Sequence, residues 1–255
     1  TMAAKKETVK KTAKKKTAKK TVKKKVVKKP AKKTAKKPVK KTAKKSSANF
    51  GPAVTAQRMF NLAALSETVS GPGVAASLPQ HVLARGKKAF IVTDQGVRGA
   101  GIVTPIVENL EKAGVPTLVF DQVSPNPTDV NVAAGVAALN RFGVEGTVVV
   151  FIGGGSVMDC GKYIALAAPN GVDNLHLAFA PNLDANDRID FGTLAPRAQA
   201  SKPGLPTIAL PTTSGTASET NGGGLITDTL TNPKVHRKLT FSNPSVAPAV
   251  VLLDP

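Results

Sequence analysis

The sequence has few cysteines, few aromatic residues and no long apolar segment, and each shortage excludes a class of protein. Its 255 residues include one Cys, one Tyr and no Trp. The single cysteine, Cys160, excludes an internal disulfide framework and a metal cluster made of cysteines alone, and it fits a reducing setting. No run of about 18 apolar residues is present, and the first residues lack the apolar stretch of a secretory signal. We therefore expect a cytoplasmic protein with no membrane span.

Positive charge is concentrated at one end of the chain. The sequence holds 36 Lys and Arg against 16 Asp and Glu, a formal net charge of +20. Of the basic residues, 22 are lysines between Lys5 and Lys45, a segment whose one acidic residue is Glu7. The remainder has 14 basic and 15 acidic residues, so it is close to neutral. The sequence thus predicts a near-neutral body with a cationic tail.

Residues 1–47 form that tail. The unit Thr-Ala-Lys-Lys recurs there, starting at Thr12, Thr17, Thr34 and Thr42. Such a segment has little apolar surface to bury and repels itself, so we expect it to be disordered. Two roles stay open: a solvated tail that adds solubility, and non-specific contact with a polyanion such as nucleic acid or an anionic surface. No aromatic residue lies among the lysines, so base stacking is not expected.

Residues 48–255 have the composition of a globular α/β domain. Apolar runs typical of buried strands alternate with helical patterns, such as the stripe of Val132, Val136 and Leu139. This alternation predicts a parallel sheet covered by helices on both faces. The predicted strands are 88–93, 116–123, 147–152 and 207–210, and the predicted helices are 101–113, 128–142 and the segment from Gly155 to about Ala168.

Two further regions have weaker patterns. Residues 172–202 contain many polar and turn residues, so we expect loops and a short helix there. The segments 225–227, 235–241 and 250–253 are typical of strands, and we expect them to form a small antiparallel accessory.

A glycine-rich loop lies between the strand 147–152 and the helix after it. Gly153, Gly154 and Gly155 would allow a phosphate to approach the backbone, and the helix N-terminus would supply free N–H donors. Ser156 and Asp159 have the spacing of a capping box, which predicts that they fix the start of this helix. The alternative is an ordinary tight turn with a cap, but three consecutive glycines exceed what a turn needs.

Two other segments carry polar groups suited to a dinucleotide. Asp94 ends the strand 88–93, where a carboxylate can accept hydrogen bonds from ribose hydroxyls and repel a 2′-phosphate, which favours NAD over NADP. Its alternative role is to cap the loop before Gly96. The loop 211–219 concentrates hydroxyl groups that could close over a dinucleotide or orient a substrate. The usual G-x-G-x-x-G pattern is not found after the first predicted strand.

Taken together, four motifs resemble the iron-containing (group III) alcohol dehydrogenases, from about Asn61 to Pro255. Four motifs in one order are far more specific than any one of them. They are Asp94-Gln-Gly, Pro125-Asn126-Pro127-Thr128, Gly153-Gly-Gly-Ser-x-x-Asp159-x-x-Lys162 and Pro211-Thr-Thr-x-Gly-Thr-x-Ser-Glu219.

The resemblance implies a Rossmann-like, NAD(P)-binding domain of an oxidoreductase that transfers hydride between a small alcohol or aldehyde and NAD(P). It implies NAD as the cofactor, with NADP possible, and we also expect a homo-oligomer. In this family the pyrophosphate lies at the glycine loop, and iron or another divalent metal polarises the alcohol oxygen. The positions that match the family's cofactor site are Asp94, Asn126, Gly153, Gly154, Gly155, Ser156, Asp159, Lys162, Thr212, Thr213, Thr216, Ser218 and Lys238.

The sequence departs from the family at its metal site. The family's ligands, one Asp and three His, lie on an all-helical domain after the Asp254-Pro255 position, so we expect that domain, the metal ligands and the catalytic residues to be absent from this chain. His81, His176 and His236 have no ligand-like spacing. The alternatives are a non-catalytic NAD-binding module and a protein that acts through its lysine tail. The related glycerol and dehydroquinate group fits the motifs less well.

Overall fold

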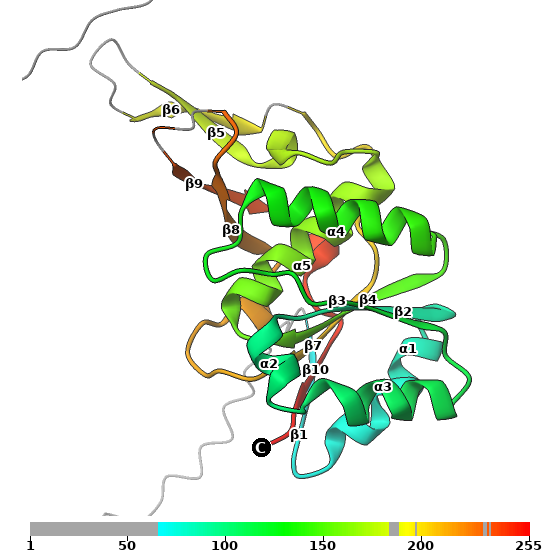
Figure 1. Cartoon of the computed structure of the whole chain (residues 1–255). Helices are drawn as coiled ribbons and strands as arrows, with labels where there is room; N and C mark the ends of the chain where they lie inside the picture. Colours follow the sequence, from blue (N-terminus) through cyan, green and yellow to red (C-terminus); the bar gives the residue numbers. More distant parts are fainter. Residues whose placement is uncertain (1–65, 184–188, 197, 232–233, 235) are drawn as a thin grey trace, which may run out of the picture. The chain divides into compact units, whose positions relative to one another are not determined.

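The computed structural model of the chain describes residues 66–183, 189–196, 198–231, 234 and 236–255. The predicted disordered tail, residues 1–47, lies outside the described residues. The described part contains a parallel sheet with helices on both faces and a smaller antiparallel sheet (Figure 1). The predicted α/β class is therefore confirmed.

The larger sheet has six strands, and every pairing in it is parallel. Strand β4 (Thr147–Gly153) lies near the middle of the sheet, and all seven of its residues are buried. Its continuous run of β-branched and apolar residues suits a strand covered on both faces. In spatial order the strands are β1 (Glu67–Ser70), β10 (Val250–Leu253), β7 (Thr207–Pro211), β4 (Thr147–Gly153), β2 (Lys88–Val92) and β3 (Thr117–Phe120).

Helices cover the two faces of this sheet (Figure 1). In β2, Ala89 and Ile91 face a cluster with α1 (Leu78–Leu83) and α3 (Val103–Lys112). Phe90 and Val92 face a second cluster with α4 (Asp129–Phe142) and α5 (Gly155–Ala167). Successive strand residues point to opposite faces, so one strand contributes to both cores. Helix α2 spans Gln95–Gly99.

The start and the buried face of α4 follow from its sequence. Thr128 is its N-cap, and its hydroxyl accepts a hydrogen bond from the N–H of Asn131, whose side chain accepts from the Thr128 N–H in return. The predicted stripe of Val132, Val136 and Leu139 is buried. The predicted helix over 128–142 is thus confirmed, as are those that became α3 and α5.

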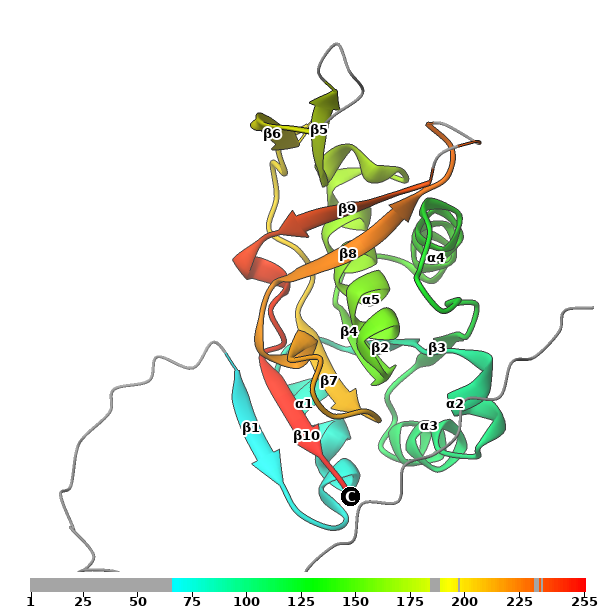
Figure 2. The same ribbon diagram turned by 90° about the vertical axis from the view of Figure 1, so that its left-hand side faces the viewer.

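The smaller sheet is antiparallel and packs on α5, as Figure 2 shows for β8 (Gly223–Asp228) and β9 (Arg237–Ser242). The ring of Phe241 on β9 meets the ring of Tyr163 on α5 edge to face, with centroids 5.0 Å apart. In spatial order its strands are β6 (Ile189–Pro196), β5 (Phe179–Leu183), β9 (Arg237–Ser242) and β8 (Gly223–Asp228).

Three features differ from the sequence-based expectations. Segment 172–202 holds the expected short helix, as the 3-10 helix Leu175–Leu177, but it also forms the hairpin β5–β6, where loops were expected. Segment 250–253 is not part of the antiparallel accessory, because β10 pairs in parallel with β1 and β7 in the larger sheet. The edge strand β1 was not predicted, since its residues are mostly exposed and form no apolar run.

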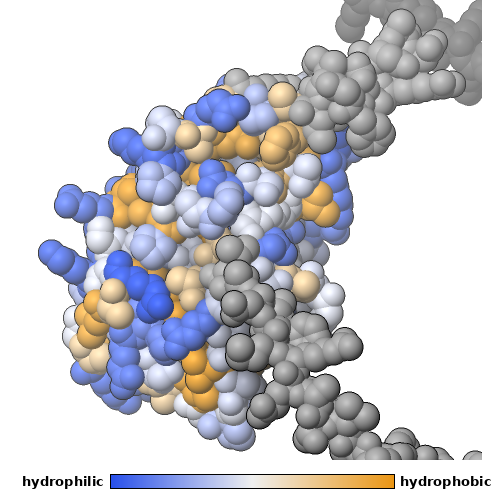
Figure 3. Space-filling model, turned by 180° about the vertical axis from the view of Figure 1, so that it is seen from behind, coloured by the Kyte–Doolittle hydropathy of each residue, from blue (hydrophilic) through white to orange (hydrophobic). Residues whose placement is uncertain are grey.

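The described surface mixes polar and apolar side chains. Figure 3 shows apolar side chains in several separate patches among hydrophilic ones on the face seen from behind. The most exposed of the large apolar residues are Leu230 at 67%, Val130 at 54% and Leu83 at 53%. Within the described ranges, no helix has both the length and the apolar character needed to cross a membrane.

Candidate functional site

Three predicted segments meet at one edge of the larger sheet. Gly153 ends β4 and pairs with Pro211 at the end of β7. Asp94 follows β2, the other neighbour of β4, by two residues. The carboxyl ends of parallel strands lie at the same edge, which is where ligands bind in open α/β sheets. The structure therefore brings the Asp94 segment, the glycine loop and the hydroxyl loop 212–217 to a common edge.

The glycine loop opens α5 without a side-chain cap. Gly154 is the N-cap residue and makes no side-chain hydrogen bond, so the first N–H groups of the helix are left for an anion or water. The predicted capping box of Ser156 and Asp159 is wrong. Asp159 lies in the second turn, and its carboxylate instead accepts hydrogen bonds from Ser218 and Leu225.

The hydroxyl loop packs directly on the glycine loop. The N–H of Thr212 donates to the carbonyl of Gly153 at 3.0 Å. A Cβ atom on Gly154 would lie 3.0 Å from the Thr213 hydroxyl oxygen, and one on Gly155 would lie 3.1 Å from Cγ2 of Thr216. Both contacts would be tight, so glycine at these positions lets the two loops approach this closely without displacing the threonines.

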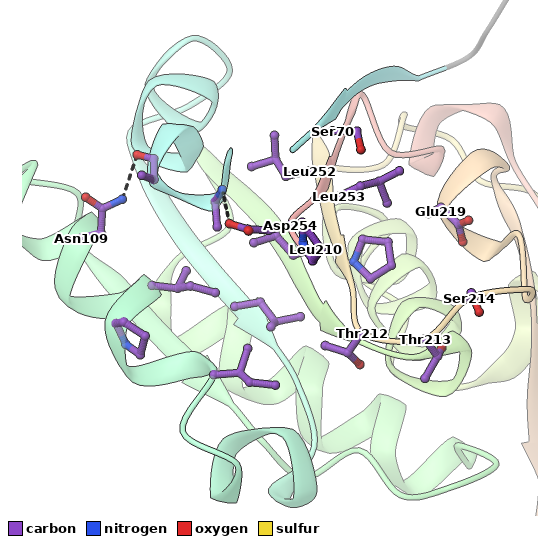
Figure 4. Close-up of a pocket in the computed structure, with 18 of the residues that line it drawn as sticks. Ser70, Asn109, Leu210, Thr212, Thr213, Ser214, Glu219, Leu252, Leu253 and Asp254 are labelled. Carbon is purple, nitrogen blue, oxygen red and sulfur yellow. Dashed lines mark hydrogen bonds between the residues drawn. The ribbon is translucent and has the colours of Figure 1, made fainter. Parts of the chain in front are cut away.

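A cavity of about 1010 Å³ begins at the hydroxyl loop (Figure 4). Thr212, Thr213 and Ser214 form a polar part of its wall, and residues of α3 and β10 form an apolar part. Asp254 also lines the cavity, and its carboxylate accepts hydrogen bonds from the N–H groups of Gly73 and Ala75, both at 2.9 Å. The glycine loop and Asp94 do not line this cavity. A ligand held by both loops would thus extend beyond it.

Asp94 has the structural role that the sequence left open. Its carboxylate accepts a hydrogen bond from the N–H of Val97 at 2.9 Å and so caps α2. The residue is half-buried. Contact with a ribose stays a prediction.

Asn126 connects the glycine loop to the smaller sheet. Its N–H donates to the hydroxyl of Ser156 at 3.3 Å, and its side-chain oxygen accepts from Nζ of Lys238 at 2.7 Å. Its φ of +55° is rare for a residue with a side chain. Asn126 therefore contacts two other residues predicted for the cofactor site, each from a different part of the chain.

A network with little exposed surface joins three further predicted residues, Asp159, Lys162 and Ser218. The Lys162 side chain is fully buried, and its Nζ donates to backbone carbonyls of Ser218, Asn221 and Gly223. Burial lowers the pKa of Lys162 to about 8, while the nearby carboxylates of Asp159 and Glu219 act in the opposite direction. In this arrangement Lys162 would affect a bound cofactor only indirectly, by holding the backbone of the segment from Ser218 to Gly223.

Sequence reasoning did not assign roles to Asn221 and Glu219. The side-chain oxygen of Asn221 accepts from Lys162 Nζ at 3.3 Å and from the Gly223 N–H at 2.8 Å. Oε2 of Glu219 is buried and has no hydrogen-bond partner among the described residues. Glu219 closes the hydroxyl motif and was visible there, whereas nothing in the sequence marks Asn221.

The described residues do not fit a divalent iron. Among them, no three or more His, Cys, Asp or Glu side chains lie together as a metal would need. His81 lies in α1, His176 in the 3-10 helix Leu175–Leu177, and His236 just before β9.

Comparison with known proteins identifies the family. Residues 66–255 match the model of the family described as iron-containing alcohol dehydrogenase. Alcohol dehydrogenase 4 of Saccharomyces cerevisiae (strain YJM789) is 35% identical over 169 residues, which are 66% of this chain and 38% of the relative. The chain thus spans well under half the length of this curated relative.

Solved structures give the same result. The crystal structure of a 1,3-propanediol oxidoreductase is 33% identical, with a TM-score of 0.61 over 78% of this chain and 46% of that one. A NADH-dependent butanol dehydrogenase A from Thermotoga maritima is 25% identical, with a TM-score of 0.63 over 77% of this chain and 44% of the other. This chain belongs to the iron-containing alcohol dehydrogenase family.

Proposed function

We propose that this chain binds a nicotinamide dinucleotide, NAD in preference to NADP, along the carboxyl edge of the larger sheet. It would serve an oxidoreductase that acts on a small alcohol or aldehyde and assembles as a homo-oligomer. The names of the relatives support the reaction class, because they act on 1,3-propanediol and butanol and one is NADH-dependent. The bound dinucleotide supplies or accepts the hydride. The residues of this chain bind and orient it.

The observation that carries the proposal is the direct contact between the glycine loop and the hydroxyl loop. Gly154 and Gly155 lie against Thr213 and Thr216, at the uncapped start of α5. Free N–H donors and the positive end of the helix suit a pyrophosphate, and the threonine hydroxyls lie next to them as further donors. A phosphate held there would contact both loops.

Residues outside the two loops would bind the rest of the dinucleotide. Asp94 would accept hydrogen bonds from the ribose hydroxyls, and its charge would repel a 2′-phosphate. Lys238, held by Asn126 next to Ser156, would face the cleft from β9. A role for iron or another divalent metal in this protein stays a prediction.

NADH titration of the chain, followed by NADH fluorescence at physiological salt, tests the proposal. Gly155→Val places a branched side chain where a single Cβ would already lie 3.1 Å from Thr216, so NADH affinity should fall by at least about tenfold. The matched control is Gly99→Val on α2, where a Cβ would meet nothing within 4 Å.

Both variants keep the lysine tail, so any NADH held electrostatically by the tail is the same in each. Equal affinity in the wild type and the two variants, or no saturable binding, would contradict the proposal.

A further inference from the structure

We propose that Asp159 and Lys162 are positioning residues that hold the hydroxyl loop against the glycine loop. They were expected to contact the cofactor themselves. Their i, i+3 spacing places both on one face of α5, and that face is turned toward the segment from Ser218 to Leu225. The inference rests on the proposed function in one respect only, because the loop they hold is the one assigned to the dinucleotide.

Lys162 holds the backbone of this segment. Its Nζ donates to the carbonyl of Ser218 at 2.9 Å and of Asn221 at 3.2 Å, and also to the carbonyl of Gly223. The side chain has no exposed surface, so no water competes for these contacts. One amino group thus binds three backbone carbonyls of the segment from Ser218 to Gly223.

Asp159 holds the same segment at its two ends. One carboxylate oxygen accepts from the Ser218 hydroxyl at 2.6 Å, and the other accepts from the N–H of Leu225 at 3.0 Å. The backbone passes so close that a Cβ on Gly224 would lie 2.8 Å from the carboxyl carbon of Asp159. The charged groups facing Lys162 are Asp159 itself, 3.8 Å away, and Glu219.

The hydroxyl loop is therefore fixed at both ends by one structural unit. At its start the Thr212 N–H is bound to Gly153, and at its end Ser218 is bound to Asp159 and Lys162. Between these points Ala217 has a φ of +55°, which a residue with a side chain rarely adopts without outside support. Loss of the second anchor should release the loop while the core beneath it stays folded.

Hydrogen exchange of the full chain tests this, read at the Thr212 amide, which touches neither proposed residue. Lys162→Met and Asp159→Ala should each lower its protection by about tenfold, because hydrogen bonds to charged groups are among the stronger ones. Protection of the β4 amides should stay unchanged. Asp159→Asn keeps one acceptor oxygen, so its Thr212 protection should lie between that of Asp159→Ala and that of the wild type. Lys112→Met on α3, with a side chain 77% exposed, is the matched control.

Wild-type protection at Thr212 in both Asp159 variants would overturn the inference. An equal loss of protection at Thr212 and in β4 would also overturn it, since that is what a general loss of stability produces. If Lys162→Met does not fold, the two Asp159 variants carry the test. NADH affinity measured in parallel should weaken about tenfold in Asp159→Ala. Failure of the wild type to bind NADH refutes the proposed function alone, because the exchange result is independent of cofactor.

Discussion

At the residue scale, Asp94 combines a structural contact with the role that we propose for it. Its carboxylate caps α2 through the Val97 N–H, and its negative charge is the basis for preferring NAD. The two roles separate on substitution, because an asparagine oxygen still caps the helix but carries no charge. If Asp94 served only as a cap, its replacement by asparagine would not change the preference for either cofactor.

Asp94→Asn should therefore shift the NADPH-to-NADH affinity ratio toward NADPH by about tenfold, which corresponds to about 1.4 kcal/mol. Its melting temperature should stay near that of the wild type. Asp94→Ala should shift the ratio in the same way and also lose about 1 kcal/mol of unfolding free energy with the cap. Parallel NADH and NADPH titrations with thermal melts measure both effects. An unchanged ratio in Asp94→Asn would remove the basis for the NAD preference.

The pKa of Lys162 gives the stability of the protein a defined pH dependence. Burial lowers this pKa to about 8 from the ordinary value of 10.5. Between these two pH values the unfolded chain retains a proton that the folded chain has released. The free energy of unfolding due to this group therefore rises with pH across the window, and the gain is lost as the pH falls through 8.

Urea unfolding of the wild type and of Lys162→Met at pH 7.5, 9 and 10.5 isolates this contribution, because the exposed lysines are common to both. The free energy of unfolding of the wild type minus that of Lys162→Met should increase as the pH rises. A shift in the opposite direction would show that the folded state raises the pKa of Lys162.

The residues of the candidate site could be located from the sequence better than their contacts could. Asp94, the glycines and the threonines come together at one sheet edge, as their positions after predicted strands suggested. The spacing of Ser156 and Asp159 also matched a capping box, but a local pattern does not reveal a partner such as Ser218, 59 residues away in the chain. Asn221 went unnoticed for the same reason.

At the scale of secondary structure elements, the predictions were best where one residue pattern dominates. The strands β2 and β4 are continuous apolar runs, and the helix α4 carries a buried apolar stripe, so one pattern decides the form of each. The hairpin β5–β6 was missed because its sequence is rich in polar and turn residues. The segment of β10 was correctly predicted to be a strand. Its partners, β1 and β7, could not be predicted, because a local sequence pattern does not determine which strands pair.

The packing of α5 on β4 requires glycine at position 161. A Cβ there would lie 2.5 Å from two carbon atoms of the Phe151 ring, which is itself fully buried. Gly161→Ala should therefore lower the free energy of unfolding by about 1–3 kcal/mol through overpacking, although alanine favours helix. Gly99→Ala, where nothing lies within 4 Å, should be neutral or slightly stabilising. Urea unfolding distinguishes the two, and a Gly161→Ala variant as stable as wild type would disprove the close contact.

At the scale of the whole molecule, the sequence divides into a cationic segment and a near-neutral body. The 22 lysines between Lys5 and Lys45 carry the excess charge, while all of the candidate site lies in residues 94–238. The two parts should therefore bind different ligands. This separation was readable from composition, because charge needs no fold to be counted.

Deletion of residues 1–47 should abolish salt-sensitive binding to a non-specific DNA duplex and leave NADH affinity unchanged. The physical reason is that such binding depends on cations that displace counterions, and the body has almost no net charge. Fluorescence anisotropy of labelled DNA at increasing salt, with NADH titration alongside, makes the measurement. DNA binding that survives the deletion would exclude the tail as its source.

The most direct test of the central claim is where NADH binds on the chain. We would titrate isotope-labelled protein with NADH and follow the backbone amide signals by NMR. The largest shifts should fall on Gly154, Gly155 and Ser156 together with the hydroxyl loop 212–217. Shifts confined to residues 1–47, or saturable shifts that leave both loops unmoved, would contradict it.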